Sequence, residues 1–282
     1  MKVSLFYCSI CNIACEHCFL DKSLPGIRME DSLFQKILRE LYLAKDSIRL
    51  ISISGGEAML FLDEIAAMID EIDLKHELTF SIATNAFWAV SKEKAEGVCE
   101  KLIASNIRRL EISYDIFHAK FIDLGNVYNA VEACKKYGIT VYIIFSAANG
   151  YDYLPLYIKC CKIVNKEQII LQHVANYGNA RRNKVNCMLP INMFKNQKCN
   201  QVLNPCIDYN ANFYACCGAN ILSQSSPMLV GNICEDSFAV LVDKMNKSEL
   251  YHKILNKGPL QSMPDVDNVK ECSSLCELCE CL

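Results

Sequence analysis

The stretch "CNIACEHCFL", residues 11–20, carries Cys11, Cys15 and Cys18, and Cys8 lies just upstream. It follows a short apolar run at residues 3–7, which is typical of a buried strand. The cysteine loop therefore leaves the carboxyl end of the first strand. Three closely spaced thiols at such a position predict metal or redox chemistry.

The composition argues against disulfides as the reason for so many cysteines. The chain has 282 residues, of which 18 are cysteine, and 52% are hydrophobic, so it can build a core without cross-links. Its net charge is −3 and no block of like charge occurs, which argues against nucleic-acid binding. We see neither a signal peptide nor an apolar run long enough to span a membrane. We therefore expect a cytoplasmic protein without membrane or nucleic-acid partners.

Outward from the cysteine loop, strand-like and helix-like segments alternate. The strand-like runs cover residues 3–7, 48–53, 78–83, 109–113, 140–145 and 168–174, and the helix-like segments cover 30–45, 61–72, 91–104, 124–137 and 152–164. Ser91 is the expected N-cap of the third helix, and Gly138 is placed to end the fourth. This order predicts an α/β fold with a parallel sheet, as a partial (β/α)6 barrel. Its functional site is expected at the carboxyl ends of the strands.

After about residue 190 the alternation stops. "PCIDYNANFYACC", residues 205–217, predicts a hairpin that turns near residues 210–212, and a helix is expected over 236–256. The chain then closes with "CSSLCELCECL", residues 272–282. We therefore expect two domains, a barrel over 1–190 and a small β-hairpin and helix lobe over 191–282.

The first cysteine set suggests an iron–sulfur cluster. Cysteine thiolates are the usual ligands of such clusters, and three of them leave the fourth iron of a four-iron cluster open to a small chelating ligand. A structural zinc would need a fourth ligand, which Cys8 could supply. The loop alone leaves both readings open.

The rest of the chain resembles the radical S-adenosylmethionine (SAM) enzymes. Cys11, Cys15 and Cys18 match the cluster motif of that family, and "SGGEAM" (54–59) matches its G-G-E motif. "ATNAFW" (83–88), "ISYDIFH" (112–118), "FSAANG" (145–150) and "HVANYGNA" (173–180) end the later strands. The resemblance assigns SAM contacts to His17, Gly55, Gly56, Glu57, Asn85, Ser113, Asp115, Ser146 and Gly178.

The resemblance also implies the chemistry of this site. An electron from the reduced cluster cleaves SAM to methionine and a 5′-deoxyadenosyl radical, which takes a hydrogen atom from the substrate. The protein supplies binding, orientation and exclusion of side reactions. In this scheme the Glu57 carboxylate pairs with the methionine ammonium.

The second cysteine set resembles the auxiliary-cluster lobe of the SPASM/twitch group. The resemblance assigns one further four-iron cluster to Cys199, Cys216, Cys276 and Cys279, although Ala211 stands where that group has a glycine. A structural zinc on the same four thiolates is the alternative. Cys206 fits the motif spacing badly, and Cys234, Cys272 and Cys281 have no assigned role. Cys99, Cys134, Cys160 and Cys161 lie in helix-like segments and are expected to be small buried hydrophobes.

The doublet Cys216–Cys217 favours one reaction class. Neighbouring residues on a strand face opposite ways, so if Cys216 binds the cluster, Cys217 can face the active cavity. The alternatives are that Cys217 is packed or is itself the ligand. Within the twitch group the chain most resembles peptide epimerases, in which a cysteine thiol returns hydrogen to a Cα radical. Carried over, Cys217 is the catalytic donor.

We therefore expect an epimerase that converts L- to D-residues in a ribosomally made peptide, with SAM and two [4Fe–4S] clusters. Its expected partners are the precursor peptide and a reductant such as flavodoxin or ferredoxin. The chain starts just before its first strand, so we expect no N-terminal leader-binding domain. Other possibilities are a cross-linking or oxidising peptide maturase, a small-alcohol dehydrogenase, and a non-enzymatic zinc or iron–sulfur protein.

Overall fold

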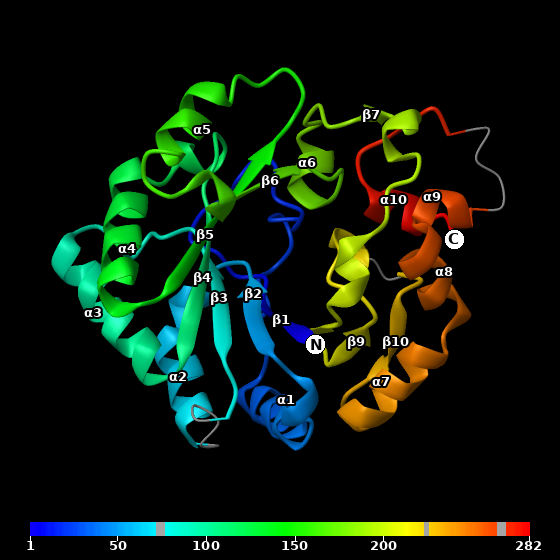
Figure 1. Cartoon of the computed structure of the whole chain (residues 1–282), viewed down its shortest axis with the longest axis horizontal. Coiled ribbons are helices and arrows are strands. Elements are labelled where there is room, and N and C mark those ends of the chain that lie inside the picture. Colours follow the sequence, from blue (N-terminus) through cyan, green and yellow to red (C-terminus); the bar gives the residue numbers. More distant parts are fainter. Residues whose placement is uncertain (72–76, 223–225, 264–268) are drawn as a thin grey trace.

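The computed structural model describes residues 1–71, 77–222, 226–263 and 269–282. Its main sheet has nine strands in the order β10-β9-β8-β1-β2-β3-β4-β5-β6 (Figure 1). The six parallel strands of the barrel are β1 (Lys2–Cys8), β2 (Leu50–Gly55), β3 (Phe80–Thr84), β4 (Ile107–Ser113), β5 (Thr140–Ala147) and β6 (Ile169–His173). The predicted α/β fold with a parallel, partial barrel sheet is therefore confirmed.

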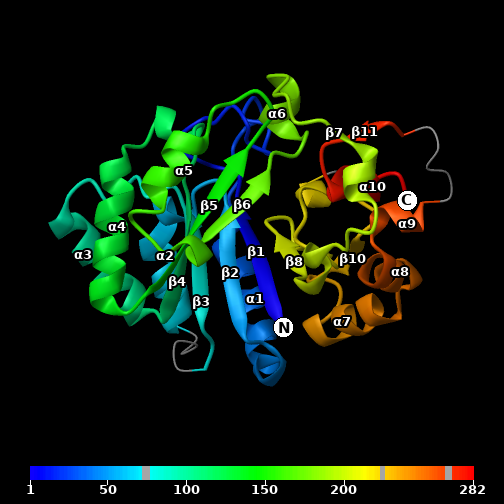
Figure 2. The same cartoon turned by 45° about the horizontal axis from the view of Figure 1, so that its top comes forward.

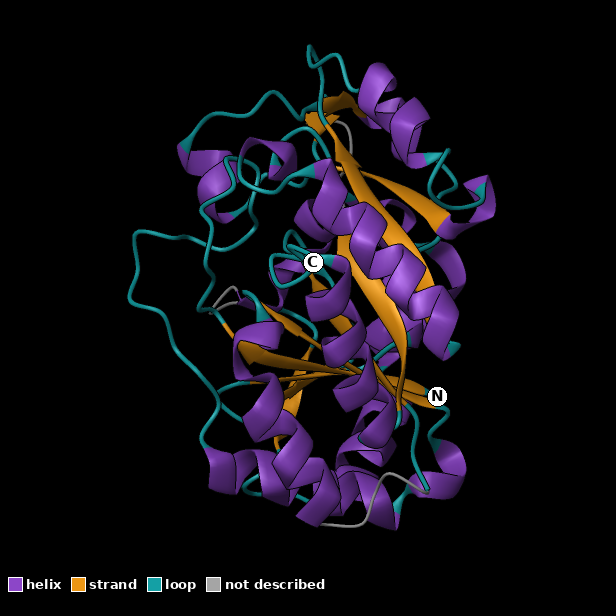
Figure 3. Cartoon of the chain, turned by 90° about the vertical axis from the view of Figure 1, so that its left-hand side faces the viewer, coloured by secondary structure: helices purple, strands orange, loops and turns teal. Residues whose placement is uncertain are grey.

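Helices cover the outside of this sheet (Figure 3). They are α1 (Asp31–Leu43), α2 (Leu62–Glu71), α3 (Lys92–Ala104), α4 (Leu124–Tyr137) and α5 (Leu154–Cys160). The Ser91 side chain accepts the N–H of Lys94, and Gly138 ends α4 with a φ of 69°, so both predicted caps are confirmed. α5 is shorter than expected, and residue 72, expected as the last of the second helix, lies outside the described residues.

Alternation along each strand separates a helix-facing side from an inner side. On β1, Tyr7 packs against Phe34 of α1 with ring centroids 5.1 Å apart, so Ser4 and Phe6 face inward. Lys2 Nζ lies 3.3 Å from Glu111 Oε1 although two strands separate β1 from β4. This ion pair can form because the sheet curves, and the inner side is the concave face on which a barrel holds its ligands.

The C-terminal part continues the same sheet. β8 (Cys206–Asp208) pairs with β1 in parallel and with β9 (Asn212–Tyr214) in antiparallel fashion, which confirms the predicted hairpin. Ala211 in its turn has a φ of 69°, a conformation that favours glycine. The hairpin therefore brings the following residues, Cys216 and Cys217, beside β1.

Two short elements follow β6, namely α6 (Gly178–Arg182) and β7 (Leu189–Pro190). The other helices and strands of the C-terminal part are β10 (Leu229–Asn232), α7 (Phe238–Lys247), α8 (Glu249–Lys257), α9 (Pro259–Ser262), β11 (Glu271–Cys272) and α10 (Leu275–Cys279). The single helix expected over 236–256 was wrong. The chain breaks at Ser248, whose side chain accepts the N–H of Tyr251 and starts α8 as a new helix.

Within the described ranges, no helix has the length and apolar character needed to cross a bilayer. Cys99, Cys134 and Cys160 are buried and Cys161 is half-buried, as expected for cysteines that fill space.

Candidate functional site

The first cysteine loop lies at the carboxyl end of β1. Cys15 is buried, Cys11 and Cys18 are half-buried, and the Cys18 N–H donates to the Cys15 carbonyl at 3.2 Å. Burial, with smaller contributions from the neighbouring Cys15 and Cys11, raises the pKa of the Cys18 thiol to about 11. Burial also raises the pKa of Cys11. Three thiols that influence one another in this way fit a shared metal centre, because a bound metal would stabilise their thiolates.

The glycine pair after β2 packs against this loop. A Cβ on Gly55 would lie 2.2 Å from the Cys8 carbonyl oxygen, and one on Gly56 would lie 2.0 Å from that of Ile10. The Gly56 N–H donates to the Cys8 carbonyl at 2.6 Å. Only glycine permits this approach. Gly55 and Gly56 therefore fix the cysteine loop against the end of β2.

Glu57 joins two strand ends. It is 1% exposed, and its carboxylate accepts the N–H of Met59 at 3.2 Å and that of Asn85 at 2.6 Å. The Asn85 side chain in turn donates to Asn12 Oδ1 at 2.8 Å, in the cysteine loop. Burial raises the pKa of Glu57 to about 7, against the opposing effect of these N–H donors. This network connects the ends of β2 and β3 to the first cysteine loop.

Asp115 organises the end of β4. Its buried carboxylate accepts the N–H groups of Phe117 at 2.9 Å, His118 at 3.1 Å and Ser146 at 3.1 Å. His118 Nδ1 lies 2.9 Å from one carboxylate oxygen, and His17 Nε2 lies 3.6 Å from the other. Asp115 therefore holds the ends of β4 and β5 and places a negative charge beside two imidazole rings.

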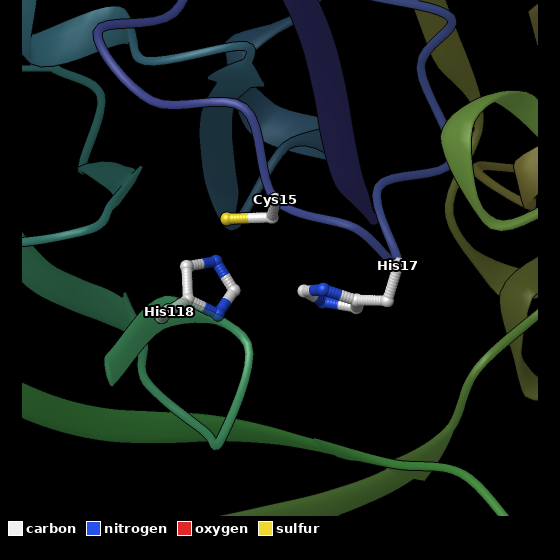
Figure 4. A group of neighbouring side chains, drawn as sticks. All are labelled: Cys15, His17 and His118. Atoms are coloured by element: carbon white, nitrogen blue, oxygen red, sulfur yellow. The ribbon is translucent and has the colours of Figure 1, made fainter. Parts of the chain in front are cut away.

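The two rings surround a cysteine thiol. The ligating atoms of Cys15, His17 and His118 all lie within 4.8 Å of one another, and Figure 4 shows both rings beside the sulfur. Burial would lower the pKa of His118, but the Asp115 charge raises it to about 10. Burial dominates at His17 and lowers its pKa to about 4. Burial would raise the pKa of Asp115, but His118 lowers it to about 2.

The start of α6 packs against the other side of the cysteine loop. Gly178 has a φ of 48°, and a Cβ there would lie 2.3 Å from the Phe19 carbonyl oxygen. The buried Asn179 side chain donates to the Cys15 carbonyl at 3.1 Å and accepts the Lys22 N–H at 3.0 Å. Gly178 thus permits the close approach of α6 to the cysteine loop, and the Asn179 side chain holds that loop by two hydrogen bonds.

Ser146 and Ser113, which the resemblance also assigns to SAM, lie at the ends of β5 and β4. Ser146 is 4% exposed, and its hydroxyl accepts a hydrogen bond from Gln172 Nε2 at 3.1 Å. Ser113 ends β4 on the inner face and is half-buried. The structure thus gathers every predicted SAM-binding residue at the carboxyl ends of the strands or in the adjoining loops.

A second pocket lies in the C-terminal part. The four cysteines assigned to an auxiliary cluster, Cys199, Cys216, Cys276 and Cys279, all line it, together with Gly218 and Asn220. A Cβ on Gly218 would lie 2.7 Å from the Cys276 sulfur. Burial raises the pKa of Cys276 to about 11 and that of Cys279 to about 12. Four thiols that line one pocket, with no room for a side chain at residue 218, fit a closed metal centre.

The other cysteines of this region do not line the pocket. Cys206 is buried in β8, Cys272 donates to the Ser274 carbonyl at 3.1 Å, and Cys234 and Cys281 are exposed.

Cys217 does not itself line the cysteine pocket, and the doublet follows the end of β9 instead of lying on that strand as expected. The Cys217 thiol donates at 2.8 Å to Oε1 of Gln201, which does line the pocket. Burial raises the pKa of Cys217, while the Ser4 hydroxyl and the Lys2 charge lower it. Ser4 belongs to the inner face of β1, so Cys217 lies between that concave face and the edge of the cysteine pocket, which Cys216 lines.

Sequence reasoning missed two residues of this site. His118 belongs to the motif "ISYDIFH", but nothing in the sequence shows that it meets Cys15. Asn179 follows Gly178, which the resemblance assigns to SAM. Both residues lie close in sequence to a residue assigned to SAM, and this was the one signal that could have found them. Their partner Cys15 lies more than 100 residues away in sequence.

Comparison with known proteins gives two matches in sequence. A family model described as the radical SAM superfamily matches residues 5–153, which is more than half of the chain. A protein of Bacillus subtilis (strain 168), YydG, described as a candidate peptide biosynthesis protein, is 32% identical over 139 residues. That match covers 48% of this chain and 42% of the Bacillus protein, so the chain matches less than half of that relative's length.

Solved structures share the fold. Streptococcus suis SuiB bound to the precursor peptide SuiA superposes with a TM-score of 0.61 and 13% identity, covering 99% of this chain and 70% of SuiB. The enzyme anSMEcpe with bound AdoMet superposes with a TM-score of 0.58 and 14% identity, covering 90% and 83%. At these identities the likeness concerns the fold.

Proposed function

The chain belongs to the radical SAM superfamily, and we propose that it is a peptide epimerase, with Cys217 as the group that returns hydrogen to the substrate. One observation carries the proposal: Cys216 lines the cysteine pocket, whereas Cys217 does not line it and lies beside Ser4 and Lys2 of the concave face. A thiol on that face can donate a hydrogen atom to a carbon radical, because an S–H bond is weaker than most C–H bonds.

The superfamily uses SAM and a [4Fe–4S] cluster. In this chain Cys11, Cys15 and Cys18 would hold the cluster, and SAM would supply the 5′-deoxyadenosyl radical that removes a Cα hydrogen. The strand-end residues described above would bind SAM beside it. Their dense hydrogen bonding to the cysteine loop supports this role, because it fixes the loop before any ligand arrives.

We assign a second [4Fe–4S] cluster to Cys199, Cys216, Cys276 and Cys279. The common pocket and the lack of space at Gly218 support four protein ligands. The barrel would then comprise residues 1–190 and the auxiliary lobe 191–282, joined through the β1–β8 pairing.

A ribosomally made precursor peptide is the proposed substrate. The name of the Bacillus relative, which refers to peptide biosynthesis, supports it. SuiB, which shares the fold, was solved with a precursor peptide, and anSMEcpe was solved with both AdoMet and a peptide. We propose that a flavodoxin or ferredoxin in the cytoplasm supplies two electrons per turnover, one that cleaves SAM and one that, with a proton, returns the Cys217 thiyl radical to the thiol.

The test is an anaerobic reaction of the cluster-loaded chain with a candidate precursor peptide in deuterated water. The exchangeable thiol should place one deuterium at an inverted Cα, which mass spectrometry and chiral amino-acid analysis detect. A product that lacks solvent deuterium and is two hydrogens lighter would contradict epimerisation. It would instead indicate an oxidising or cross-linking maturase that passes the electron to the auxiliary cluster.

A further inference from the structure

A short segment touches both cysteine sites. We call Asn176–Ala180 the bridge. On one side, the Asn179 side chain donates to the Cys15 carbonyl at 3.1 Å, and the Ala180 N–H donates to the Cys18 carbonyl at 3.2 Å. The bridge therefore holds the backbone of Cys15 and Cys18, two of the three cysteines in the first set.

Its other end reaches the C-terminal tail. The Asn176 N–H donates to Ser273 Oγ at 2.9 Å. The Ser273 hydroxyl and N–H both donate to one oxygen of Glu277, at 2.7 Å and 2.8 Å. Glu277 lies on α10 between Cys276 and Cys279, two of the four thiols in the second pocket. Figure 2 shows α6 between the first loop and the tail that carries α10.

These contacts form one continuous chain from α10 to the first loop. Its inner members are shielded from water, with Ser273 1% exposed and Asn179 2% exposed. A buried hydrogen bond that loses its partner leaves an unsatisfied polar group, so each link resists separation from the next. The close approach of Gly178 to the Phe19 carbonyl adds a rigid contact in the middle of the bridge.

We propose that Ser273 and Asn179 are positioning residues that couple the two cysteine sites, so that the order of α10 determines how firmly the first loop is held for SAM. The inference rests on the proposed function in that the two sites hold clusters. The coupling is reciprocal: SAM binding at the first site should also stabilise α10.

Amide hydrogen exchange on the anaerobically purified, cluster-loaded chain tests the coupling directly. Ser273→Ala removes the acceptor of the Asn176 N–H. Exchange should become at least about threefold faster at Asn179, Ala180 and Lys22 as well as at Asn176. The matched control is Ser262→Ala, which removes a hydroxyl that donates to the Gly258 carbonyl at 2.8 Å in the same lobe but outside the chain of contacts.

SAM affinity gives the second readout. Ser273→Ala should raise the Kd for SAM about three- to tenfold at unchanged iron content, whereas Ser262→Ala should not. Glu277→Gln keeps the side-chain shape and weakens the same links, so it should move both readouts by a smaller factor. This variant decides the question if Ser273→Ala does not fold.

Exchange that changes only near residues 273–279, with Lys22 and Ala180 as in the wild type, would overturn the coupling. So would an unchanged SAM affinity in Ser273→Ala. If the second pocket contains no iron, the auxiliary cluster of the proposed function is wrong. The exchange rate at Lys22 still tests the coupling through the bridge in that case, because the hydrogen bonds that form the bridge do not involve a cluster.

Discussion

The Glu57 carboxylate accepts the backbone N–H of Asn85 at 2.6 Å, which ties the end of β2 to the end of β3. Its other oxygen accepts the N–H of Met59. A carboxylate oxygen has more than one acceptor site, so pairing with the methionine ammonium remains compatible with both contacts. Glu57 therefore has a structural role in addition to the binding role predicted for it.

Replacing Glu57 should separate these two roles. Glu57→Ala leaves two N–H groups without an acceptor, at a cost of about 1–3 kcal/mol each, and should weaken SAM binding about ten- to a hundredfold. Glu57→Gln keeps one acceptor oxygen and the shape, so it should lose the charge-dependent part of SAM binding with less destabilisation. Calorimetry and thermal unfolding measure the two effects. Glu64→Ala, at an exposed position on α2, is the control. Unchanged SAM affinity in both Glu57 variants would show that the residue only joins the strands.

The stability of the metal-free chain should depend on the titration of Glu57. Burial raises its pKa from 4.5 to about 7, so between these values the folded state binds a proton that the unfolded state has lost. The contribution to the free energy of unfolding, about 3 kcal/mol, is complete below the unfolded pKa and disappears as the pH rises through about 7. Denaturant unfolding across this range should show the wild type losing about 3 kcal/mol of stability relative to Glu57→Gln, which does not titrate at this position. A constant difference would argue against the raised pKa.

Gly178 and Gly97 should respond oppositely to alanine. Gly178 has a positive φ and presses on the Phe19 carbonyl, so Gly178→Ala should displace the bridge, destabilise the chain by more than about 1–2 kcal/mol and weaken SAM binding. Gly97 lies within α3 with no atom in reach of a Cβ, so Gly97→Ala should stabilise the chain by about 0.5–1 kcal/mol. Melting temperatures and SAM titration compare the two. Equal responses would mean that the close approach at Gly178 relaxes without cost.

The sequence predicted the barrel because its strands are short apolar runs separated by helical periodicity. The resemblance to the SPASM/twitch group singled out the four cysteines that line the second pocket. What the sequence could not show are contacts between residues distant in the chain, such as His118 with Cys15 or Asn176 with Ser273. Such contacts depend on how the ends of the strands converge in space. Neither the periodicity of the sequence nor the spacing of its motifs predicts this convergence. The break at Ser248 was missed because an apolar pattern continues through it.

Iron content should separate the two cysteine sets. If both hold four-iron clusters, anaerobic reconstitution should give about eight irons per chain. Replacing Cys11, Cys15 and Cys18 by Ala should leave about four and abolish SAM cleavage, and replacing Cys276 and Cys279 should remove the other cluster. Cys281→Ala, at an exposed thiol outside the pocket, is the control and should keep the full content. Zinc without iron in protein purified without oxygen would contradict both assignments.

The doublet Cys216–Cys217 decides the reaction class. Cys217→Ala removes a thiol that faces Gln201 and the concave face, and it leaves the four cysteines of the pocket in place. The variant should keep its iron and still form 5′-deoxyadenosine from SAM and peptide. The substrate radical would then have no hydrogen donor, so formation of D-residues should stop and other products should appear.

Cys216→Ala is the matched variant, because it removes the neighbouring thiol from the pocket. It should lose iron from the second site, whereas Cys217→Ala should not. The two adjacent residues therefore give opposite results in two independent measurements, iron content and product chirality. If Cys217→Ala still forms D-residues that carry solvent deuterium, another group donates the hydrogen. If Cys217→Ala instead loses iron, Cys217 is a cluster ligand and the divergence of the two thiols does not explain the chemistry.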